Sequence, residues 1–120
     1  DLSQYEAESS FHDATGAGRG YACAGGVAEA IEKCINEYYP DVEVSIEHAE
    51  GLAECKKTLT LAKAGRLISC LIEGMGCPGG CIAGAGTNIP VLKAKKDLAA
   101  YVKNSTTPIP PKELEEIELE

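Results

Sequence analysis

The sequence predicts an α/β fold: a small layered domain in which a short mixed sheet is flanked by helices. Two observations predict this class. Residues 24–39 and 91–103 place apolar side chains three and four positions apart, which is typical of amphipathic helices. Residues 42–47 alternate between apolar and polar, and residues 66–73 form an almost wholly apolar run, which are two usual strand patterns. The two kinds of element alternate along the chain, as they do in layered α/β domains.

The amino-terminal part leads from a polar segment into the first helix. Residues 1–10 are polar and acidic, and we expect them to form a flexible leader. Residues 11–15 predict a weak strand, and residues 16–20 predict a loop because every second position is glycine. The first helix is expected over residues 24–39, and Pro40 ends it. Its apolar face consists of Val27, Ala30, Ile31, Cys34, Ile35 and Tyr38.

The middle of the chain predicts a strand, a helix and a second strand. Residues 42–47 fit a half-buried strand, and residues 48–51 fit a turn. A helix is expected over residues 52–64, because Gly65 supplies a common carboxyl-terminal stop. Residues 66–73 then fit a central strand that is buried on both faces. The expected apolar stripe of this helix is Leu52, Cys55, Leu59 and Ala62.

The carboxyl-terminal part predicts one more helix and a tail. The helix is expected over residues 91–103, and residues 104–111 contain several helix breakers that indicate a linker. Residues 112–120 are acidic and fit either a small docking helix or a frayed tail. The apolar side of the helix is Leu92, Leu98, Ala99 and Val102, and the rest is basic. The expected organisation is a leader over 1–10, a lobe over 11–104, and a Pro-rich linker with an acidic tail over 105–120.

Composition narrows the classes of partner. The chain has 120 residues, which is enough for one domain, and a net charge of −8. The negative charge argues against nucleic acid and against anionic membrane surfaces as partners. No apolar run approaches the roughly 18–20 residues that span a bilayer, and no export signal is visible. Six cysteines without such a signal favour a reduced, cytoplasmic protein over a disulfide framework.

The chemistry of the chain is concentrated just after the apolar strand, in residues 73–86. Cys77 and Cys81 stand four positions apart and are separated by a proline and two glycines. Thiolates are the soft ligands that zinc and iron–sulfur clusters prefer. Both kinds of centre usually need four ligands, and the two histidines, His12 and His48, do not complete a metal-like spacing. The residues alone leave open a zinc site, an iron–sulfur site and a loop without a ligand.

The other four cysteines have weaker claims to a ligand role. Cys34 and Cys55 lie on predicted core faces of helices, and Cys70 lies in the apolar strand. Cysteine at such positions commonly packs as a small hydrophobic residue. Cys23 differs because it directly precedes a predicted helix, and we expect it either to line a cofactor cavity or to pack.

Two stretches resemble a known family. The pattern Met75-x-Cys77-Pro78-Gly79-Gly80-Cys81-x-x-Gly84-x-Gly86 resembles the third cluster-binding signature of the iron-only (di-iron) hydrogenases. Residues 16–30 resemble the segment that opens a helix in the same catalytic domain. The two stretches follow in the family's order, about fifty residues apart. The resemblance covers roughly residues 11–90 and implies one lobe, the carboxyl-terminal one, of a larger catalytic domain.

The resemblance implies a cofactor and roles for individual residues. The family's active site holds a four-iron four-sulfur cubane linked to a di-iron unit with CO and cyanide, through four cysteines from three segments. Cys77 matches the ligand of the cubane alone, Cys81 the ligand that bridges to the di-iron unit, and Met75 a methionine packed beside that unit. Gly79 and Gly80 are expected to let main-chain amides approach the cluster sulfurs. Cys23 departs from the pattern, in which a small residue such as Ala or Thr is expected.

The resemblance also implies partners outside these 120 residues. The remaining ligand segments, of a Thr-Ser-Cys type and a Pro-Cys-x-x-Lys type, are absent here, so an upstream lobe of a parent chain is expected to supply them. Ferredoxin is the expected electron partner of the parent, which would reduce protons reversibly to hydrogen. The chain alone is expected to be inactive. Residues 84–90 depart from the family's glycine-rich run, which leaves both a catalytic and a sensory parent open.

Two further hypotheses belong to other classes of protein. In the second hypothesis, the chain is a complete small protein that binds an iron–sulfur centre or zinc, or senses redox state, without catalysis. Cys77 and Cys81 would then be ligands, with Cys23 as a further candidate, and cluster assembly across a dimer would supply four cysteines. The third hypothesis is an interaction or sensory module that kept the fold and lost the chemistry.

Overall fold

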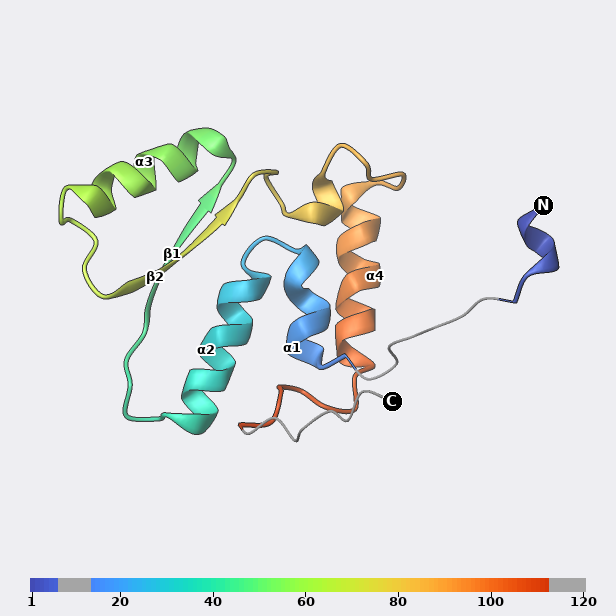
Figure 1. Ribbon diagram of the computed structural model, residues 1–120, viewed down its shortest axis with the longest axis horizontal. Helices are drawn as coiled ribbons and strands as arrows, with labels where there is room; N and C mark the ends of the chain where they lie inside the picture. Colours follow the sequence, from blue (N-terminus) through green and yellow to red (C-terminus); the bar gives the residue numbers. More distant parts are fainter. Residues whose placement is uncertain (7–13, 113–120) are drawn as a thin grey trace.

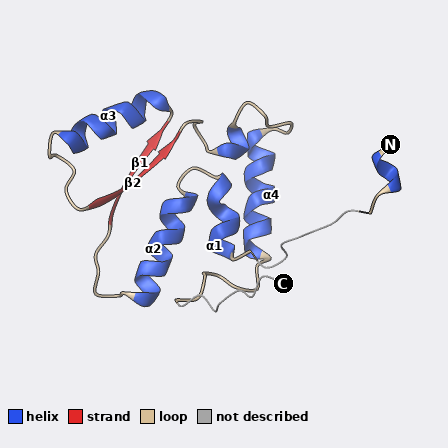
Figure 2. Ribbon diagram, in the orientation of Figure 1, coloured by secondary structure: helices blue, strands red, loops and turns tan. Residues whose placement is uncertain are grey.

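The fold is a pair of parallel strands with helices on both sides (Figures 1 and 2). The computed structural model describes residues 1–6 and 14–112. Strand β1 (Ser45–Glu50) pairs in parallel with strand β2 (Cys70–Met75), and helix α3 (Leu52–Lys63) connects them. The predicted α/β class is confirmed. The other described elements are η1 (Leu2–Gln4), α1 (Gly16–Arg19), η2 (Gly20–Ala22), α2 (Gly26–Tyr38), η3 (Cys81–Ala83) and α4 (Val91–Lys103), where η marks a 3-10 helix.

The three long helices form where the apolar spacing predicts them. The predicted apolar face of α2 is buried or half-buried, whereas those of α3 and α4 are so only in part. In α3, Leu52 and Leu59 are 77% and 61% exposed, and in α4 Leu92 is 85% exposed. For these three residues the expectation of an apolar, buried side is wrong. Helix α3 packs on β1 and β2, and of its three leucines only Leu61 is half-buried. The half-buried residues of α3 are Cys55, Thr58, Leu61 and Ala62.

Both strands lie further along the chain than predicted. The register pairs Ser45 with Cys70 and Glu50 with Met75. Residues 48–50, expected in a turn, therefore belong to β1, and the chain turns only at Gly51, where φ is 86°. The expectation of a β2 segment buried on both faces is also wrong, because its residues are half-buried or exposed and Ile68 before it is 78% exposed. Alternation within one strand cannot reveal where its partner strand begins.

Residues 16–20, expected to form a loop, instead form α1 and the start of η2. Thr15 caps α1, because its Oγ1 accepts a hydrogen bond from the Gly18 N–H at 3.0 Å. The N–H of Gly16 donates to the Thr107 carbonyl at 2.7 Å, so the segment after α4 also holds this helix in place. The weak strand expected over 11–15 falls partly outside the described residues. Of the acidic tail over 112–120, only Lys112 lies inside them.

Small residues make up the buried interior. Among residues 1, 3–6 and 14–112, every buried residue is glycine or alanine: Gly16, Ala17, Gly26, Ala28, Ala30, Ala49, Gly80 and Ala94. Backbones therefore approach closely, while the larger apolar side chains stay half-buried or exposed. Figure 1 shows α1, α2 and α4 packed side by side on the opposite side of the strands from α3. Across the described part of the chain, we find no helix with the length and apolarity to cross a membrane.

Candidate metal centre

The loop that carries Cys77 and Cys81, residues 76–81, is called the cysteine loop. It starts at the carboxyl end of the strand pair. Glu50 and Met75 are paired at the end of the register, so β1 and β2 finish at the same edge. The Gly51 N–H donates to the Met75 carbonyl at 2.7 Å. Beyond this point β1 leads into α3, and β2 leads into the cysteine loop. Ligand sites in parallel sheets collect at this edge, because the connecting loops converge there. The prediction that the loop leaves from the carboxyl end of a strand is thus confirmed.

Residues 77–80 form a tight turn that leaves both cysteines exposed. The Gly80 N–H donates to the Cys77 carbonyl at 3.0 Å, with Pro78 and Gly79 at the two central positions. Gly79 has a φ of 88°, and proline followed by a residue with positive φ is typical of a type II turn. Cys77 and Cys81 are both exposed and free. A Cβ on Gly84 would lie 3.4 Å from the Cys77 Sγ, so the small residue leaves room for the thiol.

The cysteine loop lies directly against the segment that opens α2. The Ala24 N–H donates to the Gly79 carbonyl at 3.2 Å. A Cβ on Gly80 would lie 2.4 Å from the Ala24 nitrogen and 2.6 Å from the Ala22 carbonyl oxygen. Gly80 also has a φ of 88°, so no other residue fits at this position without displacement. The two glycine-rich stretches, far apart in the sequence, therefore form one structural unit.

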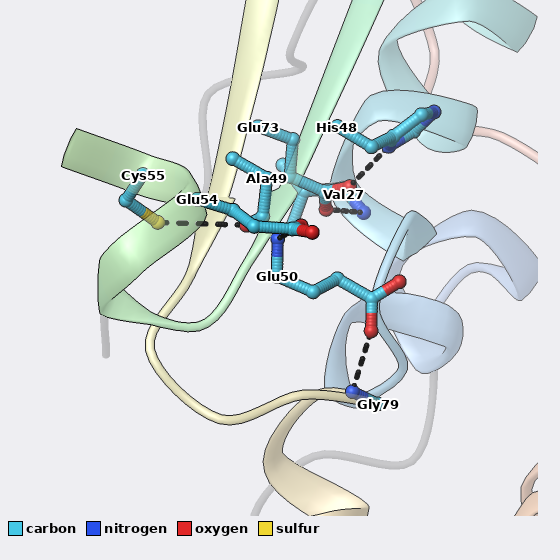
Figure 3. A network of polar contacts seen from close by, with 8 residues as sticks. All are labelled: Val27, His48, Ala49, Glu50, Glu54, Cys55, Glu73 and Gly79. Atoms are coloured by element: carbon cyan, nitrogen blue, oxygen red, sulfur yellow. Dashed lines mark hydrogen bonds and ion pairs between the residues drawn. The ribbon is translucent and has the colours of Figure 1, made fainter. Parts of the chain in front are cut away.

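Two carboxylates from the strands accept hydrogen bonds from backbone N–H groups at this unit (Figure 3). The Glu50 Oε2 accepts a hydrogen bond from the Gly79 N–H at 2.7 Å, in the middle of the cysteine loop. The Glu73 Oε1 accepts one from the Val27 N–H at 3.0 Å, and its Oε2 lies 3.1 Å from the His48 Nδ1. The sequence analysis did not identify Glu50 or His48 as part of the site. Only the register, which pairs Glu50 with Met75 and His48 with Glu73, brings them to it.

The other predicted site residues lie around the loop in different ways. Met75 is half-buried at the end of β2 and lines a cavity of about 280 Å³ between that strand and α2. Cys23 is half-buried and lines a separate cavity, also of about 280 Å³, between α2 and α4. Within the described residues, no group of three or more His, Cys, Asp or Glu side chains could hold a metal ion. Cys77 and Cys81 therefore form half of a four-ligand site at most.

The remaining cysteines occupy packing positions. The Cys55 Sγ lies 3.5 Å from the Ala49 carbonyl oxygen, between α3 and the sheet. Cys34, in α2, lines a cavity together with Tyr21 and Tyr39. Cys70 is half-buried at the start of β2. All three are half-buried, which agrees with the expectation that they serve as small hydrophobic residues.

The chain is thus an α/β lobe with a glycine-rich loop, carrying two exposed cysteines, at the carboxyl end of a parallel strand pair. A comparison with protein-family models identifies the lobe: residues 1–85 match the model described as iron only hydrogenase large subunit, C-terminal domain. The match covers 85 of 120 residues and contains residues 16–30 and the cysteine-containing stretch up to residue 85. The chain belongs to this family and is a hydrogenase-like lobe. A search of curated proteins gave no match.

Proposed function

We propose that this chain supplies Cys77 and Cys81 as two of the four cysteine ligands of the active-site cluster in an iron-only hydrogenase. The observation that supports the proposal is the contact between the two stretches that resemble the family, residues 16–30 and 75–86. That contact orders the turn between the cysteines and leaves both thiols exposed at the sheet edge. The reaction is the reversible reduction of protons to hydrogen, with ferredoxin as the electron partner of the parent chain.

The donor set fits a cubane linked to a di-iron unit as one half of its ligand shell. Both exposed side chains are thiols, which are the ligands that iron–sulfur clusters take. Gly84 leaves space beside the Cys77 Sγ, and Gly79 and Gly80 keep the loop backbone free of side chains. When bound, the cluster would relay electrons from ferredoxin and provide the iron site for proton reduction. In this chain, Cys77 and Cys81 hold the cluster, and the loop glycines leave space for it because they have no side chains.

An upstream lobe of the same parent chain supplies the other two ligands in this proposal. The interior of this lobe supports the need for a partner, since its buried residues within the described ranges are only glycine and alanine. The cavity beside Met75 is lined by residues of β2 and α2, and Met75 lies two positions before Cys77. The chain alone therefore holds no complete cluster and evolves no hydrogen.

The test compares cysteine variants of the parent chain, produced anaerobically with the cluster-assembly machinery. Cys77→Ser and Cys81→Ser are expected to lower iron content and abolish hydrogen evolution with reduced ferredoxin. Cys34→Ser is the matched control, because that thiol lines a cavity to which no residue of the cysteine loop contributes. Wild-type iron content and activity in Cys81→Ser would refute the proposal. Hydrogen evolution by the 120-residue chain alone, above its own Cys81→Ser variant, would refute the requirement for an upstream lobe.

A small non-catalytic iron–sulfur or zinc module is the second candidate. The exposure of both thiols favours it, because two copies of the chain could bring four cysteines to one centre. Iron, sulfide and zinc content after anaerobic reconstitution, measured together with the mass of the particle, distinguishes the two. A stoichiometric centre in a dimer supports the module, and a metal-free monomer supports the lobe.

A further inference from the structure

Glu73 is a carboxylate that the proposed ligand set does not use, yet it is nearly removed from solvent. Its side chain is 8% exposed, whereas its partner His48 is 52% exposed. Burying a carboxylate is unfavourable unless hydrogen bonds compensate for the lost water. Glu73 has two such partners, the Val27 N–H and the His48 Nδ1 (Figure 3). A buried and fully oriented carboxylate beside a functional loop calls for a specific role.

Helix α2 lacks a cap of its own. Its N-cap residue is Gly25, which has a φ of 86° and no side chain that could accept a hydrogen bond. The first N–H groups of a helix have no partner within the helix and carry partial positive charge. Glu73 satisfies one of these groups, at Val27, from a strand 46 positions further along the chain. A Cβ on Gly25 would lie 3.9 Å from the Glu73 Oε2, an ordinary contact distance, so the carboxylate lies directly beside the start of α2.

The cysteine loop packs against the amino-terminal end of α2, the end that Glu73 caps. Ala24 lies just before this end and donates to the Gly79 carbonyl, and Gly80 packs on residues 22–24. A shift at the start of α2 would therefore be passed to the turn between Cys77 and Cys81. The two backbones are in close contact at this point, because a Cβ on Gly80 would lie only 2.4 Å from the Ala24 nitrogen.

We propose that Glu73 is a positioning residue for the cysteine loop: by capping α2 from strand β2, it fixes residues 22–24 as the base on which Gly79 and Gly80 set the two thiols. His48, its partner across the strand pair, orients the carboxylate. The inference rests on the proposed function only in treating this loop as the ligand loop.

Amide hydrogen exchange of the 120-residue chain tests the mechanical part of the inference. In Glu73→Ala, the amides of Val27 and Ala24 are expected to exchange roughly 10- to 100-fold faster, as loss of a charge-assisted hydrogen bond predicts. Glu73→Gln keeps an acceptor and should stay within about threefold of the wild type. Glu32→Ala is the matched control, since it removes an exposed carboxylate from the same helix. If Val27 accelerates while Ala24 and Gly80 do not, Glu73 is only a helix cap and the inference is overturned.

A second variant covers the case in which Glu73→Ala fails to fold. His48→Ala leaves the bond from Glu73 to Val27 in place and removes only its second partner. Exchange at Ala24 should then rise by about threefold while amides within α3 are unchanged. An unchanged rate at Ala24 in His48→Ala would count against the inference.

Binding of Cd²⁺ alone tests the consequence for the thiols, without the iron cluster. Cadmium is a soft cation, and its bonds to Cys77 and Cys81 absorb in the ultraviolet. Glu73→Ala should weaken this binding by roughly 5- to 10-fold, and Glu73→Gln should restore it, because only the acceptor is needed. Wild-type affinity in Glu73→Ala overturns the inference. The proposed function fails separately, if the wild-type parent acquires no iron through Cys77 and Cys81 although Cd²⁺ binding depends on Glu73.

Discussion

Helices α2 and α3 both begin after a glycine with a φ of 86°, at the carboxyl edge of the same strand pair, yet their first turns are held in different ways. At the start of α3 the side-chain contact is local and caps none of the helix's own N–H groups: the Glu54 Oε2, in the first turn, accepts from the N–H of Glu50 at the end of β1, at 3.1 Å. The start of α2 is held by the nearly buried Glu73 from another element. The cysteine loop packs on the second kind of helix start, where tertiary contacts fix the backbone.

The largest expected effect comes from breaking the contact between α2 and the cysteine loop. Gly80→Ala forces a side chain into the Ala24 nitrogen and imposes a positive φ on alanine. Strain of this kind costs about 1–3 kcal/mol before the clash is added, so we expect at least about 3 kcal/mol of lost stability. The measurement is the free energy of unfolding in urea. Gly76→Ala is the control, because its Cβ meets nothing within 4 Å and it should change stability little.

The two carboxylate contacts at the helix starts should differ in strength when each is removed. Glu73→Ala deletes a buried acceptor with two partners, and we expect a loss of about 2–3 kcal/mol in unfolding free energy. Glu54→Ala deletes an exposed one, and the loss should be about 0.5 kcal/mol or less. Chemical denaturation of both variants gives the difference directly. Equal losses would show that burial of the cap at α2 adds nothing, and the contrast between the two helices would disappear.

The sequence predicted the elements of this comparison better than the contacts between them. The three long helices follow from local apolar spacing, and the cysteine loop from its own residues. The partners of that loop could not be read in the same way. Glu50 lies in a stretch expected to be a turn, and it reaches Gly79 only because β1 extends to Glu50 and ends beside Met75. The pairing of strands is a long-range property that no single stretch encodes.

Residues 16–20 show the same limit in a helix. Their glycines predict a loop, because glycine is a poor helix former. The structure makes a short helix there, capped by Thr15 and fixed by Thr107. Gly16 is buried, and its Cβ position lies 3.4 Å from the carbonyls of Val102 and Pro108. The glycine was selected by a tertiary contact from the far end of the chain, which local propensity does not report.

A smaller effect is expected at Glu50, which holds the cysteine loop from an exposed side chain. Glu50→Ala removes the acceptor for the Gly79 N–H, and exchange of that amide should accelerate by about threefold to tenfold. The stability of the whole chain should change by less than about 1 kcal/mol, because the bond is exposed. Nuclear magnetic resonance of the Gly79 amide is the measurement. Glu47→Ala, also in β1, is the control, and an equal change in both variants would argue against a specific contact from Glu50.

The smallest effect is expected on the outer face of α3, where the sequence predicted burial and the structure shows exposure. Leu59→Ser should change the free energy of unfolding by no more than about 0.5 kcal/mol, because Leu59 is 61% exposed. Leu61→Ser, on the half-buried face toward the strands, should cost about 1–2 kcal/mol. Urea unfolding of both variants decides the order. A larger loss for Leu59 in the isolated chain would mean that α3 turns its leucine stripe inward, and the local contact at the start of α3 would then no longer contrast with the tertiary cap of α2.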